Sequence, residues 1–287
     1  MRGMPDLALA QQFLAAHARV LDRRRFERLF LGGDPESVRD AVAAYRNADG
    51  GFGHGLEPDG RTPGSQPAAT EQALRILHQA DAWDELLAED ACDQLARTAP
   101  ADGGAIFVDP NVEGWPHAPW WQPEDGLPAS LVSTGQIAGT LHARGVAHPW
   151  LARATELMWA RIDTLEAPGA YELYGVLRFL DHVRDRERAA AALVRVEPAL
   201  RSVVTLDPEA PGETHSPLDF APAPSSIARP LFDDATIAAH LDHLAAGQQD
   251  DGGWTFNFPA WSPAAEADWR GCFTVDALDT LRRNGRT

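Results

Sequence analysis

The sequence contains no lysine, because all 25 of its basic residues are arginine. Schiff-base enzymes, pyridoxal-dependent enzymes and Walker-type phosphate loops each need a lysine amine, so these classes are excluded. Cysteine is scarce as well, since Cys92 and Cys272 are the only two. They lie far apart without a metal-ligand spacing, which indicates a reducing compartment rather than a disulfide framework. We therefore expect a cytoplasmic protein.

Long apolar runs and clustered positive charge are also missing. Residues 6–31 are interrupted by His17, Arg19 and Arg23–Arg25, so this segment predicts neither a signal peptide nor an integral membrane span. The formal net charge of −17 argues against nucleic acid or an anionic membrane as a partner. With 287 residues, of which 44% are hydrophobic, the chain is long enough to bury a substantial core. We expect one domain over residues 1–287.

What the sequence does contain is an internal repeat of Asp-Gly-Gly followed by a bulky or apolar residue. The three clear copies are Asp49–Phe52, Asp102–Phe107 and Asp251–Trp254. The first two aspartates are 53 residues apart, and the second and third are 149 apart, which is close to three periods of that length. Two degenerate copies are therefore expected between them, at Glu166–Tyr171 and Asp207–Gly212. Glycine reaches positive φ easily, so each copy predicts a helix end after which the aromatic residue turns back onto the helices. The aspartates are therefore expected to be structural.

Helical periodicity covers most of the chain, and no segment shows a convincing strand pattern. The expected helices cover ten ranges: residues 6–30, 35–47, 66–80, 84–98, 130–145, 149–164, 170–184, 187–204, 233–248 and 270–284. Short turns near 81–83, 146–148 and 185–186 alternate with long loops near 50–65, 103–129, 205–232 and 252–269. In a ring of helical hairpins alternate connections lie at opposite ends, so the long loops would share one end. That end is the expected working face.

The most complete copy of the repeat, Gln248–Trp254, resembles the Gln-x-x-Asp-Gly-Gly-Trp repeat of the terpenoid cyclase and protein prenyltransferase superfamily. The resemblance implies an all-α fold, an α/α toroid in which inner helices surround a cavity and outer helices surround them. The other copies depart from the motif, because Arg46 and Ala99 stand where glutamine is expected. The second copy also has Ala105 in place of the aromatic residue. These departures weaken the transfer of function more than the transfer of fold.

Two functional motifs of that superfamily are incomplete here. The segment Leu231–Thr236 resembles the Asp-x-Asp-Asp acid of the cyclases, but its first aspartate is missing. Asp233 and Asp234 open the helix that leads to Gln248, which indicates an outer helix, so capping and the helix dipole explain them. Asp268 and Cys272 do not reproduce the zinc spacing of the prenyltransferases. We expect no metal and no cofactor, and without lysine a diphosphate substrate is not indicated.

The long loops hold the candidate chemistry. The segment His54–Arg61 offers His54, Glu57 and Asp59, which together with His117 could supply a general acid, a base and an orienting partner. A metal site from the same four residues has no known spacing. A structural alternative is that Glu57 and Asp59 hold the loop through backbone amides and Arg61. Asp268 is a further candidate catalytic residue if it faces the cavity with Arg270; alternatively, it caps the helix expected from residue 270.

Aromatic residues in these loops could stabilise a carbocation or stack on a sugar ring, because both uses need exposed ring faces. An alternative is that they form small cores beneath the loops. The residues predicted to bind substrate are Phe52, Arg61, Trp115, Trp120, Trp121, Trp254, Trp261, Trp269 and Arg270.

Three classes of function remain open. The first is a small, atypical terpenoid-cyclase-like enzyme that binds an apolar, isoprenoid-type small molecule in an aromatic-lined cavity and cyclises it by acid initiation. The second is a carbohydrate-active toroid, a hydrolase, lyase or epimerase, with paired carboxylates. The third is a non-catalytic ligand-binding or partner-binding toroid. The repeat motif favours the first, although a fold resemblance by itself does not establish function.

Overall fold

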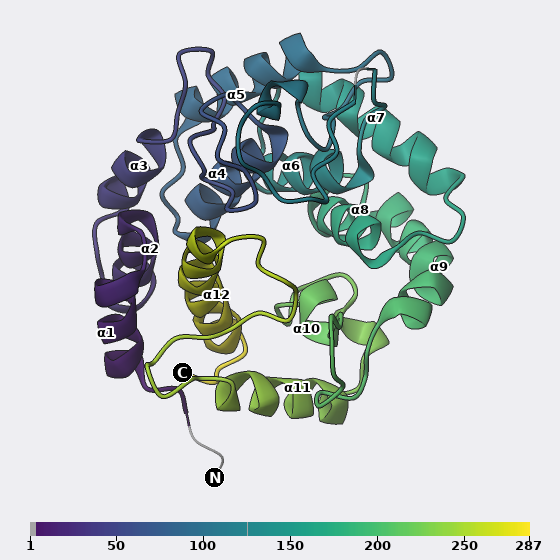
Figure 1. Ribbon diagram of the computed structural model, residues 1–287. Coiled ribbons are helices and arrows are strands. Elements are labelled where there is room, and N and C mark those ends of the chain that lie inside the picture. The colour runs from purple at the N-terminus through teal and green to yellow at the C-terminus, as the bar shows by residue number, and fades with distance from the viewer. Residues whose placement is uncertain (1–3, 125) are drawn as a thin grey trace. The chain divides into compact units, whose positions relative to one another are not determined.

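The computed structural model describes residues 4–124 and 126–287, and its regular structure is helical (Figure 1). Within these residues there are twelve α-helices and two short 3-10 helices, and no strand beyond two isolated bridges. The α-helices are α1 (Leu7–His17), α2 (Val20–Phe30), α3 (Pro35–Ala43), α4 (Pro67–Gln79), α5 (Glu85–Thr98), α6 (Leu131–Ala143), α7 (Pro149–Asp163), α8 (Ala170–His182), α9 (Arg186–Val203), α10 (Pro217–Phe220), α11 (Asp234–Ala246) and α12 (Pro263–Arg283). The all-α fold class is confirmed.

The chain forms two compact units. The terminal unit contains the residues up to Asp34 together with Leu200–Thr287, and the middle unit contains Pro35–Ala199. The prediction of one domain over residues 1–287 stays a prediction. None of the helices in the described residues has the length and apolar character that a bilayer-spanning helix needs.

In the middle unit, helices that alternate along the chain pack side by side. α4 contacts α6 and α6 contacts α8, whereas α5 contacts α7 (Figure 1). α6 and α8 approach closely because glycines face each other: a Cβ on Gly135 would lie 2.3 Å from the backbone oxygen of Gly175. These contacts form two rows, α4–α6–α8 and α5–α7, as expected when each helical hairpin contributes one helix to each row.

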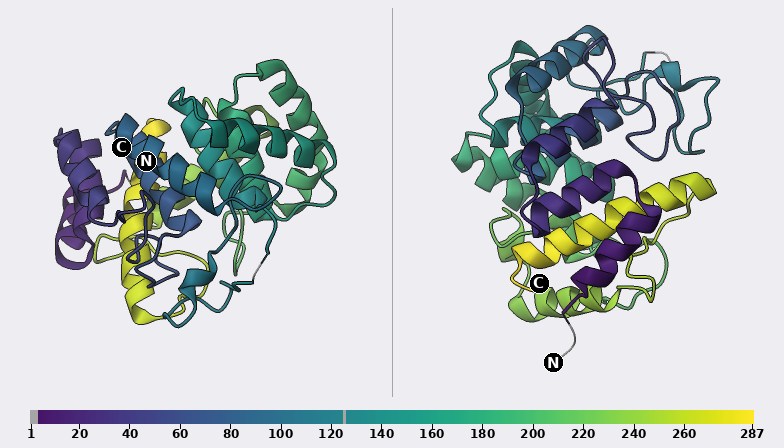
Figure 2. Two further views of the ribbon diagram at one scale, coloured as in Figure 1. Left: turned by 90° about the horizontal axis from the view of Figure 1, so that it is seen from above. Right: turned by 90° about the vertical axis from the view of Figure 1, so that its left-hand side faces the viewer.

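In the terminal unit, α12 packs against α1, α2 and α11, and α10 packs against α11. Figure 2 shows α12 lying across the α1–α2 pair. A buried ion network joins α2 to α12: Asp22 accepts from Arg25 at 3.1 Å, and Arg25 donates to Asp276 at 2.5 Å. Because Asp22 and Arg25 are both fully buried, each needs its partner to offset lost hydration.

The Asp-Gly-Gly copies form turns, as the sequence predicts. In the first and third copies the aspartate Oδ1 accepts from the second glycine N–H, Gly51 or Gly253, at 3.0 Å in both cases. The first glycines have φ of +90° at Gly50 and +93° at Gly252, the left-handed region that favours glycine. The degenerate copy at Asp207 keeps a related turn, because its Oδ1 accepts from Glu209 N at 3.0 Å.

The turns also fix the residue that follows them. Ala105 N donates to Thr134 Oγ1 and Trp254 N donates to Thr274 Oγ1, both at 2.9 Å. Thr134 lies on α6 and Thr274 on α12. In these two copies, therefore, a hydrogen bond to a threonine ties the turn to the helix that follows it.

Two expected helix boundaries are wrong. The helix expected over 6–30 is divided into α1 and α2, because Ala18 and Arg19 are extended. The helix expected from residue 270 starts at Pro263, where Ser262 is the N-cap and accepts from Ala265 N at 3.1 Å. Asp268 therefore lies inside α12 and does not cap it. The cap role of Asp233 is confirmed, since it accepts from Thr236 N at 2.7 Å at the start of α11.

Candidate functional site

The first candidate region is the pair of loops in the middle unit that carries Glu57, Asp59 and Trp120. Trp120 Nε1 donates to Asp59 Oδ2 at 2.7 Å, and Asp59 N donates to Glu57 Oε2 at 2.8 Å. The Asp59 carbonyl accepts from Ala118 N at 2.7 Å. Asp59 is only 7% exposed, so its carboxylate links the loops from a buried position.

The same loops pack closely on each other. An isolated bridge pairs Gly60 with His117, and Arg61 N donates to Pro116 O at 2.9 Å. The ring of Trp121 lies against the Gly60 backbone, so that a Cβ on Gly60 would be 2.5 Å from it. The cavity beneath, which Glu57, Gln66 and Trp121 help to line, has a volume of about 10 Å³. That volume is close to the space of a single water molecule.

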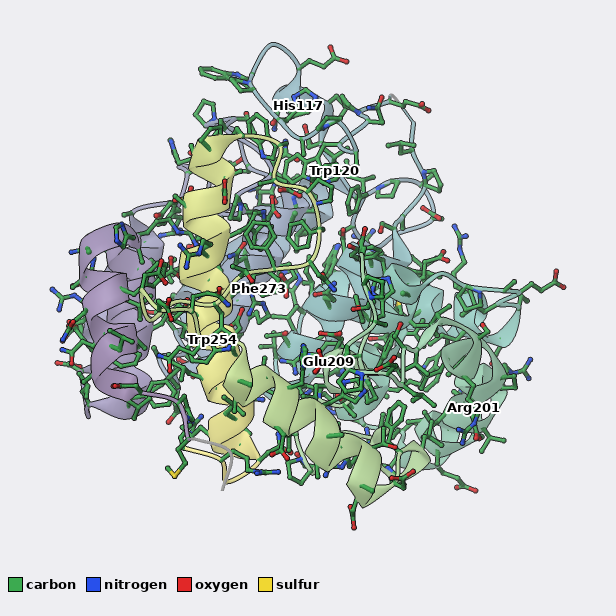
Figure 3. The ribbon with its side chains drawn as sticks, turned by 60° about the horizontal axis from the view of Figure 1, so that its bottom comes forward. His117, Trp120, Arg201, Glu209, Trp254 and Phe273 are labelled. Carbon is green, nitrogen blue, oxygen red and sulfur yellow. The ribbon has the colours of Figure 1, made fainter. Side chains whose placement is uncertain are left out.

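The two histidines predicted for this region make separate contacts. His54 is exposed, with its Nε2 2.9 Å from Asn47 Oδ1. His117 Nδ1 lies 2.8 Å from Trp115 O, and because a carbonyl can only accept, this nitrogen carries the proton. Figure 3 labels His117 and Trp120 in this loop region. The structure thus brings Glu57, Asp59 and Trp120 together, while each histidine bonds a different residue.

The aromatic residues predicted to bind substrate divide into buried and exposed groups. Phe52 is 0% exposed, and Trp121 and Trp254 are each 3% exposed, so these three side chains belong to the core. Trp254 Nε1 also donates to Leu244 O at 2.8 Å. Trp115 and Trp120 remain 48% and 42% exposed. Only the exposed group, together with Trp261 and Trp269, presents ring surface to a ligand in this conformation.

The second candidate region lies in the terminal unit, where four rings form an aromatic cluster. The cluster consists of Phe256, Phe258, Trp269 and Phe273, with ring centroids 4.6 to 5.8 Å apart. Trp269 and Phe273 are one helical turn apart on α12, so they lie on the same side of the helix; Figure 3 labels Phe273. All four residues are partly exposed. Trp261, in the same loop, is also partly exposed.

A carboxylate lies on the segment that is hydrogen-bonded to this cluster. Asn257, between the two phenylalanines, donates through Nδ2 to Thr214 O at 2.9 Å and to Thr214 Oγ1 at 3.0 Å. A few residues along, Asp219 in α10 accepts from Ser216 N at 2.6 Å. The rings and the carboxylate therefore lie on two segments joined by one side chain.

The environment shifts the pKa values of two groups in this region toward each other. Desolvation raises the pKa of Asp219 above its ordinary value, while hydrogen bonds from Ser216 and the charges of His215 and His240 oppose the shift. The residue as a whole is exposed to solvent, which limits the desolvation. Burial lowers the pKa of His240, and its hydrogen bond to Leu206 O opposes that shift. His240 Nε2 lies 3.1 Å from this carbonyl, so the neutral ring has Nδ1 as its basic nitrogen. Both shifts bring the acidity of the carboxyl group closer to that of the imidazole, which makes proton transfer between such groups less costly.

Arg270 and Asp268, also predicted as site residues, both lie on α12. Arg270 stacks over Phe13 at 4.6 Å and pairs with Asp251 at 2.9 Å. It also lines a surface cleft of about 180 Å³ together with Phe13, His17, Pro263, Glu266 and Ala267. Asp268 is partly exposed and directly precedes Trp269 of the aromatic cluster. Arg270 is thus turned toward α1, while its neighbour Trp269 contributes to the cluster.

The described part of the chain contains no cluster of side chains arranged to bind a metal ion. No three histidine, cysteine, aspartate or glutamate side chains there converge as ligands. Cys272 is buried, its Sγ accepts from Arg19 Nη2 at 2.8 Å, and burial raises the pKa of its thiol to about 12. A thiol with that pKa remains protonated at neutral pH and is a poor nucleophile.

The sequence alone did not select Asp219, His240 or the three phenylalanines of the cluster. Ser216 and Asp219 have the spacing of a helix capping box, which suggests only a structural role. Phe256 and Phe258 alternate along a loop without helical periodicity. A usable signal was the density of aromatic residues between Trp254 and Phe273, which is higher than in the other long loops.

No protein-family model matches the chain, and no curated protein shows significant similarity to it.

Proposed function

We propose that this protein is a small terpenoid-cyclase-like enzyme that cyclises an apolar, isoprenoid-type small molecule in the cytoplasm. The observation that carries the proposal is the partly exposed aromatic cluster, joined through Asn257 to the segment that bears Asp219. The Gln-x-x-Asp-Gly-Gly-Trp resemblance of Gln248–Trp254 supports the same class. It also supports an α/α toroid, for which the alternating rows α4–α6–α8 and α5–α7 are a suitable arrangement.

The aromatic cluster suits a reaction that develops positive charge on carbon. The face of an aromatic ring carries negative electrostatic potential, so it attracts a cation that has little hydration of its own. Four rings with centroids 4.6 to 5.8 Å apart offer several such surfaces close together. They also bind a neutral hydrocarbon chain through apolar contact. The same surface therefore holds the substrate and stabilises the transition state.

Asp219 is the proposed acid. Its Oδ2 accepts from Ser216 N, so Oδ1 is the oxygen that we expect to carry the proton. The proton is transferred to the terminal carbon of an alkene or to the oxygen of an epoxide, which leaves the carboxylate and a carbocation. A second π bond then attacks the cation and forms the new carbon–carbon bond. Loss of a proton to neutral His240, directly or through water, restores a double bond, and proton return to Asp219 completes the cycle.

Glu57 and Asp59, the carboxylates first predicted to act as the acid, have structural contacts instead. The Asp59 carboxylate already accepts from Trp120, and Glu57 accepts from Asp59 N, in loops whose cavity holds about 10 Å³. These contacts favour the structural alternative for both residues. Asp268 remains a competing acid because it precedes Trp269, so it is tested in parallel.

A stable organic cation tests the ring surface before any substrate is known. Dodecyltrimethylammonium below its micelle concentration, titrated against tryptophan fluorescence, should bind more tightly than uncharged dodecanol. Phe273→Leu should weaken the ammonium about fivefold, which corresponds to one cation–π contact of about 1 kcal/mol, and should leave dodecanol nearly unchanged. Trp115→Leu, which removes an exposed ring of the middle unit, is the matched control and should bind as the wild type does.

Turnover is then measured with acyclic polyprenyl alkenes and their terminal epoxides, by mass spectrometry of cyclic products isomeric with the substrate. Asp219→Asn should reduce the rate by about 10²-fold or more, as expected for a lost general acid, and Asp234→Asn should not. A loss confined to Asp268→Asn would transfer the acid role to that residue. Equal binding of ammonium and dodecanol, together with no product from any polyene, would refute the proposal.

A further inference from the structure

We infer that Asn257 is a positioning residue that fixes the aromatic cluster relative to the segment bearing Asp219. The inference rests on the proposed function, because it assigns a task within the same site. Asn257 does not touch the reacting atoms in this scheme. It sets the distance between the rings that receive a cation and the carboxyl group that creates one.

The geometry places a single side chain between two functional segments. Asn257 lies between Phe256 and Phe258, whose rings are 4.6 Å apart and both belong to the aromatic cluster. Its Nδ2 donates to Thr214 O at 2.9 Å and to Thr214 Oγ1 at 3.0 Å. Two residues beyond Thr214, Ser216 N donates to Asp219 Oδ2. The rings of the cluster are therefore connected to Asp219 through the Asn257 amide and the backbone of residues 214–216.

The chemistry requires an amide at position 257. A carbonyl oxygen can only accept, so the group that faces Thr214 O must be the Nδ2 of the amide rather than its Oδ1. An aspartate has the same shape but no donor, and it would bring negative charge against that carbonyl oxygen. A glutamine keeps the donor on a side chain that is one methylene longer. Comparing asparagine, aspartate and glutamine at position 257 therefore distinguishes the effect of the hydrogen-bond donor from the effect of side-chain size.

The position of Asn257 argues against a role in global stability. The side chain is exposed, and an exposed hydrogen bond contributes little to the free energy of unfolding. The rest of the terminal unit has buried anchors, such as Trp254 Nε1, which donates to Leu244 O at 2.8 Å. Losing the Asn257 contact should therefore leave the unit folded and release one loop from the other. Small displacements of this kind affect rate far more than stability.

The test compares Asn257→Asp, Asn257→Ala and Asn257→Gln with Thr214→Val. With a polyene that the wild type converts, kcat should fall roughly 10- to 100-fold for the Asp and Ala variants. Thr214→Val keeps the backbone acceptor and should lose less, and the Gln variant should recover part of the rate. Affinity for dodecyltrimethylammonium should stay within about twofold of wild type, because Trp269 and Phe273 are held by α12.

Hydrogen exchange gives a readout that needs no substrate. Asn257→Ala should speed amide exchange in both 205–216 and 254–262, while α11 and the melting temperature stay as in the wild type. Unchanged exchange in 205–216, an unchanged kcat in the Asp variant, or a parallel loss of kcat and melting temperature would each overturn the inference. A wild type that converts no polyene, yet shows this paired exchange response, would refute the proposed function and leave the mechanical link between the loops intact.

Discussion

The long-loop regions of the two units contain similar types of residue, but their polar groups make different contacts. Both contain tryptophans, an aspartate and neighbouring histidines, although Asp59 is buried and Asp219 is exposed. In the middle unit the polar groups bond one another: Asp59 binds Trp120, and Gln66 binds Asp109 and Asn111. In the terminal unit the rings of the aromatic cluster are partly exposed, and Asn257 joins their loop to the segment that bears Asp219, whose pKa is raised. Because Trp115 and Trp120 of the middle unit also keep exposed ring surface, the two regions differ mainly in their carboxyl groups. Asp59 accepts from an indole that joins two loops, whereas Asp219 accepts from the backbone of its own helix cap.

The sharpest test within the terminal unit contrasts Trp254 with the aromatic cluster. Trp254 belongs to the same loop but is buried, so Trp254→Ala should lower the free energy of unfolding by about 3–5 kcal/mol. Phe273→Leu should cost far less, because its ring is partly exposed. Urea denaturation followed by circular dichroism measures both. Similar losses for the two variants would mean that the cluster is a second core and not a binding surface.

A smaller effect is expected when the loop contact of the middle unit is removed. Asp59→Asn leaves Trp120 Nε1 with a neutral acceptor, and Trp120→Phe leaves the buried carboxylate without that donor. Each should lower the free energy of unfolding by about 1–3 kcal/mol, since hydrogen bonds to charged groups are the stronger ones. The double variant should lose less than the sum of the two, because they share one interaction. If Asp59→Asn kept the free energy of unfolding of the wild type but lost turnover, Asp59 and not Asp219 would be the catalytic acid.

The smallest effect concerns pH. The folded-state pKa of Asp219 is raised, so between its ordinary value of 3.8 and the raised value the folded protein binds more protons than the unfolded chain. Its contribution to stability is therefore largest at acidic pH and declines as pH rises through the raised pKa. Asp219→Asn removes that decline, so the melting temperature of the variant relative to that of the wild type should rise from pH 4 to pH 8. Parallel melting curves across this range would contradict the assignment.

Much of the helical layout follows from sequence because it depends on local patterns. Apolar spacing placed α4, α5, α6, α7 and α8 close to their observed bounds, and the Asp-Gly-Gly copies predicted turns that the structure contains. Boundaries failed where tertiary contacts decide. α12 extends back to Pro263 because Ser262 caps it and its first turns pack near α1, information that the periodicity of 270–284 does not contain.

The candidate site was harder to predict because proximity and burial are not local. The sequence singled out Glu57, Asp59, Trp120, Trp261 and Trp269 by residue type. It could not distinguish a carboxylate that is bonded to an indole, as Asp59 is, from one that is not. Phe52, Trp121 and Trp254 have the same residue types as the exposed aromatic residues, yet they are buried. Loop length and composition indicated where ligands could bind but not which aromatic side chains keep exposed surface.

The sequence by itself determined the all-α class, the turns at Asp-Gly-Gly and the absence of lysine chemistry, because these depend on residue type and short-range periodicity. The tertiary structure alone decided that Asp59 is held by Trp120, that Trp254 is core, and that Asn257 joins the aromatic cluster to the segment of Asp219. The physical reason is that hydrogen bonds and desolvation depend on which distant segments meet, and those contacts span 61 residues for Trp120 with Asp59 and 43 for Asn257 with Thr214.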